Sequence, residues 1–296
     1  MLLNRSKKYV ANVINQRFFY NPRFERMIEK LYYSPDPTAL SVPISSTTNR
    51  YLDELRENGV VVIPAFRPDV ADALNENVFS VLEGRRQRVG GQILNIMELG
   101  ERNKTSGTTT TIVSYRDPLL EPVLWDRELC GLIYNYYQRQ PYYRDQAVAV
   151  MNAPVADVNQ RIEHSSKFHS DLFHQITFQF LVDDLAASDT RLQYAVGSHR
   201  EKKFSRDRFA YDDAEVTKRY TIKDCVGPKG TMVIMDAGAG LHRGTYVPGT
   251  RRKMIHTLVT TGHSINVYGK IDSIVGWEAY KTFPGYMQKM MKKVAA

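Results

Sequence analysis

The stretch Phe168-His169-Ser170-Asp171, which stands just before an apolar, strand-like run at residues 175–182, decides how this chain is interpreted. Alternate residues of an extended segment project to the same side, so the imidazole and the carboxylate can face one ion. A third donor, His242, follows in the glycine-rich stretch 238–244. Two neutral histidines and one carboxylate can hold three octahedral positions of a ferrous ion and leave three open. The spacing therefore predicts a metal site made of His169, Asp171 and His242.

The surroundings of this stretch have the texture of a β-protein. Short apolar runs separated by turns occupy residues 147–151, 175–182, 192–196, 231–235 and 255–260. Strands at such intervals are typical of a sandwich or a barrel. An earlier run, Val60-Val61-Val62-Ile63, predicts a buried strand, and Asn58-Gly59 before it predicts the end of a short helix at 51–57. We expect helices packed around a C-terminal β-barrel.

Other segments show helical spacing. Residues 1–33 predict two short helices, and amphipathic or apolar patterns predict further helices near 70–81, 119–140 and 277–294. Residues 34–48 are rich in Pro, Ser and Thr and have the composition of a linker. The polar segment 85–117 is expected to form a hairpin or a mobile loop, and it is our candidate for a lid.

The charge of the chain is concentrated at its two ends. The net charge is +8, of which residues 1–33 carry +5 and residues 281–296 carry +4, so residues 34–280 carry about −1. A nearly neutral body argues against a broad nucleic-acid-binding face, and no nucleic-acid partner is expected. Two interpretations of the basic ends stay open: an aromatic-rich surface for an anionic membrane or a lipid-linked substrate, or solvated faces of helices that pack on the barrel.

Cysteine usage and hydropathy favour a cytoplasmic protein, with association at a membrane surface as a further possibility. Cys130 and Cys225 are too few for a disulfide framework or a four-thiolate zinc site. No run of about 18 apolar residues is present, so no membrane-spanning segment is expected. The apolar residues before Arg5 are too few for a signal peptide.

A pair of arginines follows the last predicted ligand. Arg251 and Arg252 stand about ten residues after His242, at the start of the final predicted strand. A dicarboxylate cosubstrate that chelates a metal at one end needs a cation for its far carboxylate, and arginine offers a bidentate fork with a fixed charge. Strand alternation sends the two side chains to opposite faces, so only one of them can serve.

Several separated motifs occur together in a recognisable order. They are Gly59-Val60-Val61-Val62-Ile63-Pro64, Phe168-His169-Ser170-Asp171, Leu181-Val182-Asp183, Gly197-Ser198-His199-Arg200, Gly227-Pro228-Lys229-Gly230, Leu241-His242-Arg243-Gly244 and Arg252-Lys253-Met254-Ile255. In this order they resemble the phytanoyl-CoA dioxygenase family, over roughly residues 50–262. Phe168 stands where many relatives have tryptophan.

This resemblance implies a fold, a chemistry and a site. The fold would be mainly β with flanking helices (α+β) around a double-stranded β-helix, or jelly-roll and cupin-like, core. The cofactors would be Fe(II), 2-oxoglutarate as cosubstrate and O2. His169, Asp171 and His242 would ligate iron, Arg252 rather than Arg251 would bind the C5 carboxylate of 2-oxoglutarate, and Asn152 would contact the cosubstrate. Because Asp171 is present, hydroxylation is favoured over halogenation.

The resemblance also suggests a division of the chain and a role. Residues 1–48 would be a basic helical N-terminal extension, and residues 49–296 an oxygenase domain with its jelly-roll core at about 146–262 and a C-terminal helix at about 277–294. The expected activity is hydroxylation of a small molecule, an anionic or lipid-linked one among the candidates, with release of succinate and CO2. No catalytic residue is expected beyond the metal site. The alternatives are a non-catalytic jelly-roll binding or scaffold protein, and a cupin-like metalloenzyme that does not use 2-oxoglutarate.

The remaining histidines have weaker expectations. We expect His199 to be a hydrogen-bonding turn residue and Asp236 to cap a turn before Gly238. His256 shares the strand parity of Arg252, so it is expected to point into the barrel. The histidines that flank these motifs are expected to bond locally, to line the substrate pocket or to lie on a loop: His164, His174 and His263.

Overall fold

The structure is a computed structural model that describes residues 41–80, 82, 108–113, 117–138, 141–143, 147–152, 166–171, 175–201 and 211–261. The helices predicted within 1–33 and at 277–294, and most of the candidate lid at 85–117, lie outside these residues. The division of the chain at residues 48 and 49 stays a prediction. Among the described residues, no helix is long and apolar enough to cross a membrane.

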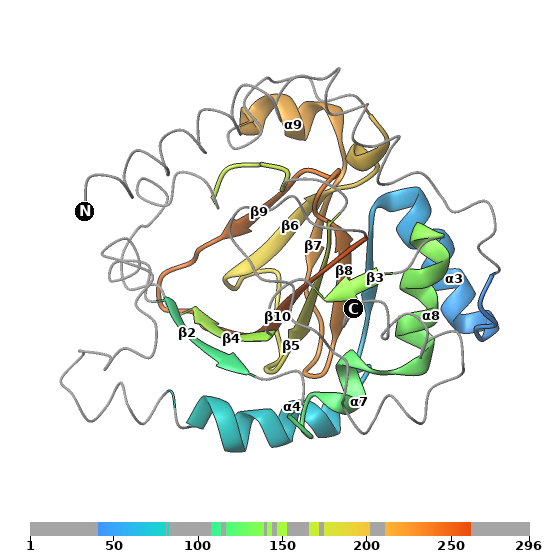
Figure 1. The fold of residues 1–296 in the computed structure, drawn as a ribbon. Coiled ribbons are helices and arrows are strands. Elements are labelled where there is room, and N and C mark those ends of the chain that lie inside the picture. The colour runs from blue at the N-terminus through green and yellow to red at the C-terminus, as the bar shows by residue number, and fades with distance from the viewer. Residues whose placement is uncertain are drawn as a thin grey trace, which may run out of the picture.

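Two antiparallel sheets form the centre of the molecule (Figure 1). The large sheet has the order β1 (Val60–Ile63), β8 (Met232–Asp236), β5 (Gln175–Leu181), β10 (Arg252–Thr261), β4 (Ala147–Asn152) and β2 (Thr108–Val113), and β3 (Pro141–Tyr143) also pairs with β10. The small sheet has the order β7 (Ile222–Cys225), β6 (Arg191–Ala195) and β9 (His242–Thr245). Apolar side chains of both sheets pack together between them. This arrangement is the double-stranded β-helix that the sequence predicts.

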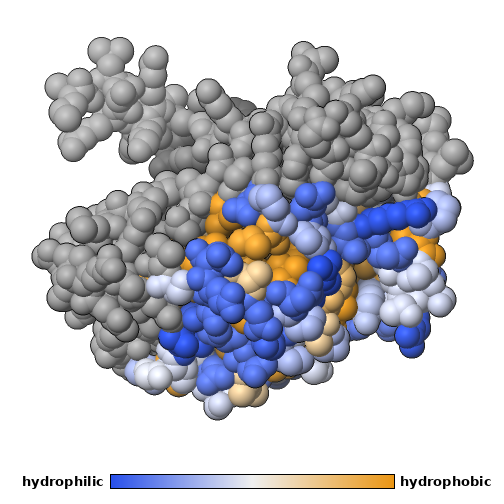
Figure 2. Space-filling view, turned by 90° about the horizontal axis from the view of Figure 1, so that it is seen from below, coloured by the Kyte–Doolittle hydropathy of each residue, from blue (hydrophilic) through white to orange (hydrophobic). Residues whose placement is uncertain are grey.

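Helices cover the outer face of the large sheet. They are α3 (Ser46–Asn58), α4 (Pro68–Leu74) continued by a π-helical turn (Asn75–Phe79), α7 (Glu121–Leu124) and α8 (Arg127–Tyr137). Their apolar residues form one core with the outward side chains of β1, β4, β5, β8 and β10. On the side seen from below in Figure 2, the described surface is largely hydrophilic and hydrophobic residues show in its middle. A further helix, α9 (Asp213–Arg219), lies near the small sheet (Figure 1).

Strand β5 shows why the two faces of the large sheet differ. All seven of its residues are buried, since the strand lies between the helical layer and the interior of the barrel. Ile176, Phe178 and Phe180 belong to the core under the helices. The alternate residues Gln175 and Gln179 therefore face the interior, because successive side chains of a strand point to opposite faces. A strand buried on both faces with one polar face indicates a functional interior rather than a solvated surface.

The strands predicted at 60–63 and from 147 onwards are confirmed, with small shifts of their ends. Helix α3 begins at Ser46, earlier than the expected residue 51, because the Ser45 hydroxyl accepts the Thr48 N–H at 3.1 Å and caps it. The helical region predicted at 119–140 divides where Asp126 caps α8. Strand β2 lies in the segment expected to be a hairpin or loop, and β3, β7, β9 and α9 were not predicted.

Gly59 offers a test of how tightly α3 is joined to the small sheet. It ends α3 with a φ of 77°, and a Cβ at this position would overlap the Tyr194 hydroxyl and the His199 ring. Gly249 has a similar φ of 81° but open space around it. We expect Gly249→Ala to lower the free energy of unfolding by about 1–2 kcal/mol, the cost of a left-handed alanine. Gly59→Ala should cost about 1–3 kcal/mol more because of overpacking.

Chemical denaturation of the two variants and the wild type measures this difference. Equal losses for Gly59→Ala and Gly249→Ala would show that the contact with Tyr194 and His199 does not constrain the junction.

Candidate metal centre

The three predicted ligands come together at one end of the barrel. The His169 N–H donates to the His242 carbonyl and the His242 N–H to the His169 carbonyl, both at 2.9 Å. The Asp171 N–H donates to the Ala237 carbonyl at 2.8 Å, which ties the third residue to the chain just before His242. The imidazole centroids are 4.4 Å apart, and the potential ligand atoms of all three residues lie within 4.8 Å of one another. These distances suit side chains that close around one ion with bonds of about 2 Å.

Backbone carbonyls set the tautomer of both imidazoles. Nδ1 of His169 lies 2.8 Å from the Lys167 carbonyl, and Nδ1 of His242 lies 3.3 Å from the Gly240 carbonyl. A carbonyl oxygen can only accept, so in a neutral ring Nδ1 carries the proton and Nε2 carries the lone pair. Nε2 of His242 is 3.9 Å from Oδ2 of Asp171. Both histidines are therefore arranged to ligate a metal through Nε2.

Gln175 holds the carboxylate of Asp171. The side-chain amide of Gln175 donates to Oδ2 of Asp171 at 2.7 Å, and the backbone carbonyl of Gln175 accepts the N–H of Gly238 at 3.0 Å. The residue is only 3% exposed. The buried amide donor therefore fixes the direction of one carboxylate oxygen. Sequence reasoning did not single out Gln175.

The turn before His242 is fixed by Asp236, which caps it as predicted. One carboxylate oxygen of Asp236 accepts the Ala239 N–H at 2.8 Å, and the other accepts the Tyr136 hydroxyl at 2.7 Å. Burial, with the nearby Asp236 charge, raises the pKa of Tyr136, so this hydroxyl stays a donor. Tyr194 donates to the Asp236 carbonyl at 3.0 Å and packs so closely on Gly240 that no Cβ fits there. The turn thereby positions His242 at the start of β9.

Arg252 is the first residue of β10, and Arg251 stands just before it. Arg252 is buried and Arg251 is exposed, which agrees with the opposite directions that strand alternation predicts. Arg251 is exposed, with Nε 3.8 Å from a carboxylate oxygen of Asp183. Arg252 is 5% exposed, and its Nε and Nη1 have no hydrogen-bond partner in the described part of the chain. Burial lowers the pKa of Arg252, yet a guanidinium stays protonated in proteins. Asn152 lies opposite Arg252 in the register of β4 and β10 and is 3% exposed.

A buried cation with two unused donors is costly unless an anion meets it. The chemistry of Arg252 therefore fits a carboxylate ligand inside the barrel, which is the role expected of it. The exposed Arg251 offers no such site.

Further polar groups line the interior between Arg252 and the ligand cluster. His256 of β10 lies opposite Gln179 of β5 in the strand register. Thr177 Oγ1 and Gln179 Oε1 are buried without a hydrogen-bond partner among the described residues. The sequence signal for Thr177 and Gln179 is the alternation Gln-x-Thr-x-Gln in an otherwise apolar strand.

His256 has the interior position that its parity predicts. The residue as a whole is half-buried. Desolvation lowers its pKa to about 4, the charge of Asp171 opposes this shift, and the charge of Arg252 adds to it. The imidazole is therefore neutral at neutral pH and can both donate and accept a hydrogen bond.

His199 lies in a short 3-10 turn (Ser198–Arg200) with Nε2 3.0 Å from the Arg56 carbonyl, so it is the turn residue expected. His164, His174 and His263 lie outside the described residues.

Comparisons with known proteins support this fold. No protein-family model matches the sequence, and no curated protein sequence is significantly similar to it. Among solved structures, the chain is similar to SnoK, a non-heme alpha ketoglutarate dependent carbocyclase from nogalamycin biosynthesis, with a TM-score of 0.50, 16% identity and coverage of 74% of this chain and 87% of that one. EctD from S. alaskensis, solved with 2-oxoglutarate and 5-hydroxyectoine, gives a TM-score of 0.52, 13% identity and coverage of 78% and 83%.

A third structure, AviO1 from Streptomyces viridochromogenes Tue57, gives a TM-score of 0.51, 13% identity and coverage of 76% and 99%. The chain thus shares its fold with iron- and 2-oxoglutarate-dependent enzymes. The fold expected from the sequence resemblance is confirmed.

The neutral state of His256 predicts how stability depends on pH. Since its folded pKa of about 4 lies below its ordinary value of 6.5, the unfolded chain binds the proton more readily. The resulting contribution to stability is fully present above pH 6.5 and is lost as the pH falls from 6.5 towards 4. We expect the free energy of unfolding of metal-free protein to fall over this window, and to fall less in His256→Gln.

Urea denaturation of both proteins at several pH values, with a chelator present, measures this slope. An identical slope for the wild type and His256→Gln would contradict a neutral, desolvated imidazole.

Proposed function

We propose that this protein is an Fe(II)- and 2-oxoglutarate-dependent dioxygenase that hydroxylates a small molecule and releases succinate and CO2. The observation that carries the proposal is the joint presence, in one barrel, of the His-Asp-His cluster and the buried guanidinium of Arg252 with two unused donors. The cluster suits a ferrous ion with open positions, and the guanidinium suits the far carboxylate of a dicarboxylate.

The residues present fit both groups. His169, Asp171 and His242 would hold the iron, with the two imidazoles presenting Nε2 because carbonyls occupy Nδ1. Bound there with 2-oxoglutarate, iron supplies activation of O2 and oxidative decarboxylation of the cosubstrate. Gln175 keeps the carboxylate of Asp171 oriented.

Arg252 would bind and orient the cosubstrate, with Asn152 beside it on β4. A cosubstrate that reaches from Arg252 to the cluster passes His256 and Gln179, which lie between them in the sheet register. Neutral His256 can hydrogen-bond to an anionic ligand without adding another charge. The helical layer on the outer face and the apolar packing between the sheets keep water from the rest of the interior.

The class of substrate is supported by the compounds named with two similar structures. EctD was solved with 5-hydroxyectoine, and SnoK is a carbocyclase of nogalamycin biosynthesis. We infer a small-molecule substrate for this chain as well. The basic segments 1–33 and 281–296 favour an anionic or lipid-linked one, and with it peripheral contact with an anionic membrane surface.

Turnover without substrate tests the iron chemistry. Purified protein given Fe(II), 2-oxoglutarate and O2 should slowly form succinate, and His169→Ala should reduce this rate to the level of a protein-free blank because a ligand is lost. His199→Gln is the matched control, since it removes a histidine of the neighbouring turn that lies outside the cluster, and it should retain the activity. If the wild type binds neither iron nor 2-oxoglutarate, the chain is a non-catalytic jelly-roll protein.

The two arginines provide a second test. We expect Arg252→Met to raise the Kd for 2-oxoglutarate by about 10- to 100-fold, since it removes charge-assisted hydrogen bonds worth about 1.5–3 kcal/mol. Arg251→Met, which changes the exposed residue just before the same strand, should leave the Kd within about twofold. Anaerobic titration of the Fe(II) protein, followed by its visible charge-transfer absorption, gives both constants.

Metal affinity measured without 2-oxoglutarate should fall in neither arginine variant, because neither arginine is a metal ligand. If Arg252→Met retains full activity and cosubstrate affinity, the protein is a cupin-like metalloenzyme that does not use 2-oxoglutarate.

A further inference from the structure

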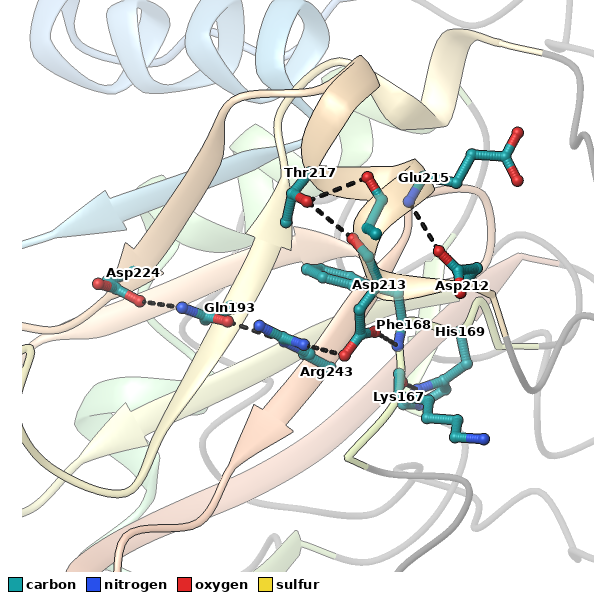
Figure 3. A network of polar contacts seen from close by, with 11 residues as sticks. Lys167, Phe168, His169, Gln193, Asp212, Asp213, Glu215, Thr217, Asp224 and Arg243 are labelled. Atoms are coloured by element: carbon teal, nitrogen blue, oxygen red, sulfur yellow. Dashed lines mark hydrogen bonds and ion pairs between the residues drawn. The ribbon is translucent and has the colours of Figure 1, made fainter. Parts of the chain in front are cut away.

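A polar and aromatic cluster lies directly behind the metal centre, on the outer side of the small sheet. Arg243 follows His242 in β9, and Phe168 precedes His169, so both point away from the ligand side of their segments. The guanidinium carbon of Arg243 lies 4.5 Å from the centroid of the Phe168 ring. Figure 3 shows the two side chains next to each other, close to His169. The neighbours of the two histidine ligands therefore contact each other through a cation–π interaction.

Asp213, the first residue of α9, joins the same two segments with one carboxylate. One oxygen accepts the N–H of Phe168 at 3.5 Å, and the other accepts Nη1 of Arg243 (Figure 3). The helix that carries Asp213 is capped by Asp212, whose carboxylate accepts the Glu215 N–H at 2.9 Å. The Asp213 carboxylate thus links Phe168, which precedes the ligand His169, to Arg243, which follows the ligand His242.

The guanidinium of Arg243 is also held from its other edge. Its Nε donates to Gln193 Oε1 at 2.8 Å, and the Gln193 amide donates to Asp224 at 2.8 Å. Arg191 completes the row by donating to the same Asp224 oxygen at 2.6 Å. Because Gln193 and Asp224 lie on neighbouring strands, the plane of the Arg243 fork is anchored to the small sheet. A lysine has no such fork and could not reproduce both contacts.

We propose that Arg243, Asp213 and Phe168 form a clamp that positions His169 and His242 for one metal ion before the ion binds. This inference rests on the proposed metal-dependent function and adds positioning residues to it. The backbone hydrogen bonds between the two histidines set their spacing. The clamp stabilises these two segments from the side opposite the ligand atoms. Phe168 is further held because its carbonyl accepts the Tyr211 N–H at 2.9 Å. The guanidinium of Arg243 bonds to Asp213 and Gln193, neither of which is a predicted ligand, so the clamp acts on the ligands through the segments that carry them.

A purely structural role would attach α9 to the small sheet without influencing the ligands. The two roles differ in what they predict for metal affinity at equal stability. Residues that orient metal ligands from behind change affinity by about 10- to 100-fold when they are removed. A contact that only adds stability lowers the free energy of unfolding and leaves the metal affinity of the folded protein unchanged.

The test compares Arg243→Met with Arg191→Met. Both remove a half-buried guanidinium from the same polar row, but only Arg243 stands behind the ligands. Co(II) and Fe(II) affinities are measured anaerobically by competition with a chelator, and metal-free stability by denaturation. We expect Arg243→Met to weaken metal binding about 10-fold or more and Arg191→Met to leave it within about twofold, even where the two lose similar stability. Arg243→Lys should restore only part of the affinity, and Asp213→Asn should resemble Arg243→Met.

Equal metal affinities in the wild type and Arg243→Met, or an equal loss in Arg191→Met, would overturn the clamp while leaving the proposed function intact. A wild type that binds neither metal would overturn both. If Arg243→Met does not fold, Arg243→Lys and Asp213→Asn carry the same comparison against Arg191→Met.

Discussion

The pair of backbone hydrogen bonds between His169 and His242 is the constraint on which this site depends. It joins two segments that are far apart in the sequence and sets the distance between their two imidazoles. The capped turn at Asp236 brings His242 to this bridge, and the bond from Asp171 to Ala237 adds the carboxylate from the same side. Two imidazoles and a carboxylate so close together suit a cation, and the bridge sets the spacing that the proposed metal ion needs.

A second constraint is the separation of the two faces of the large sheet. The outward residues of β5 bury large apolar side chains under the helices, each worth on the order of 1.5–3 kcal/mol. Its inward residues leave polar atoms without partners among the described residues, each costing on the order of 1–3 kcal/mol. The free energy gained by apolar burial on the outer face can therefore offset the cost of the unpaired polar atoms on the inner face. An interior that is polar at such a cost is best explained by a ligand with matching hydrogen-bonding groups.

The sequence alone predicted those parts of the molecule that depend on local pattern. Apolar runs predicted β1 and most central strands, and the His-x-Asp spacing with a distant histidine predicted the cluster. Strands β7 and β9 escaped prediction because they are short and only partly buried, so tertiary pairing rather than composition defines them. Gln175 was missed because its role depends on a contact with Asp171, and the partners of Arg243 were missed because they come from three separate elements.

The charges inside the barrel connect the separate observations. Asp171 and Arg252 balance each other, and His256 adds no charge since burial keeps its pKa near 4. In the proposed function a ferrous ion adds +2 and a dicarboxylate adds −2, so the site is balanced with both ligands and with neither. Either ligand alone leaves two uncompensated charges in a poorly solvated interior, which is unfavourable. The metal ion and the dicarboxylate should therefore each strengthen the binding of the other. A protonated His256 would add a positive charge that neither ligand compensates. The neutral state of His256, between Arg252 and the metal ligands, therefore contributes to the zero net charge of the site together with Asp171 and Arg252.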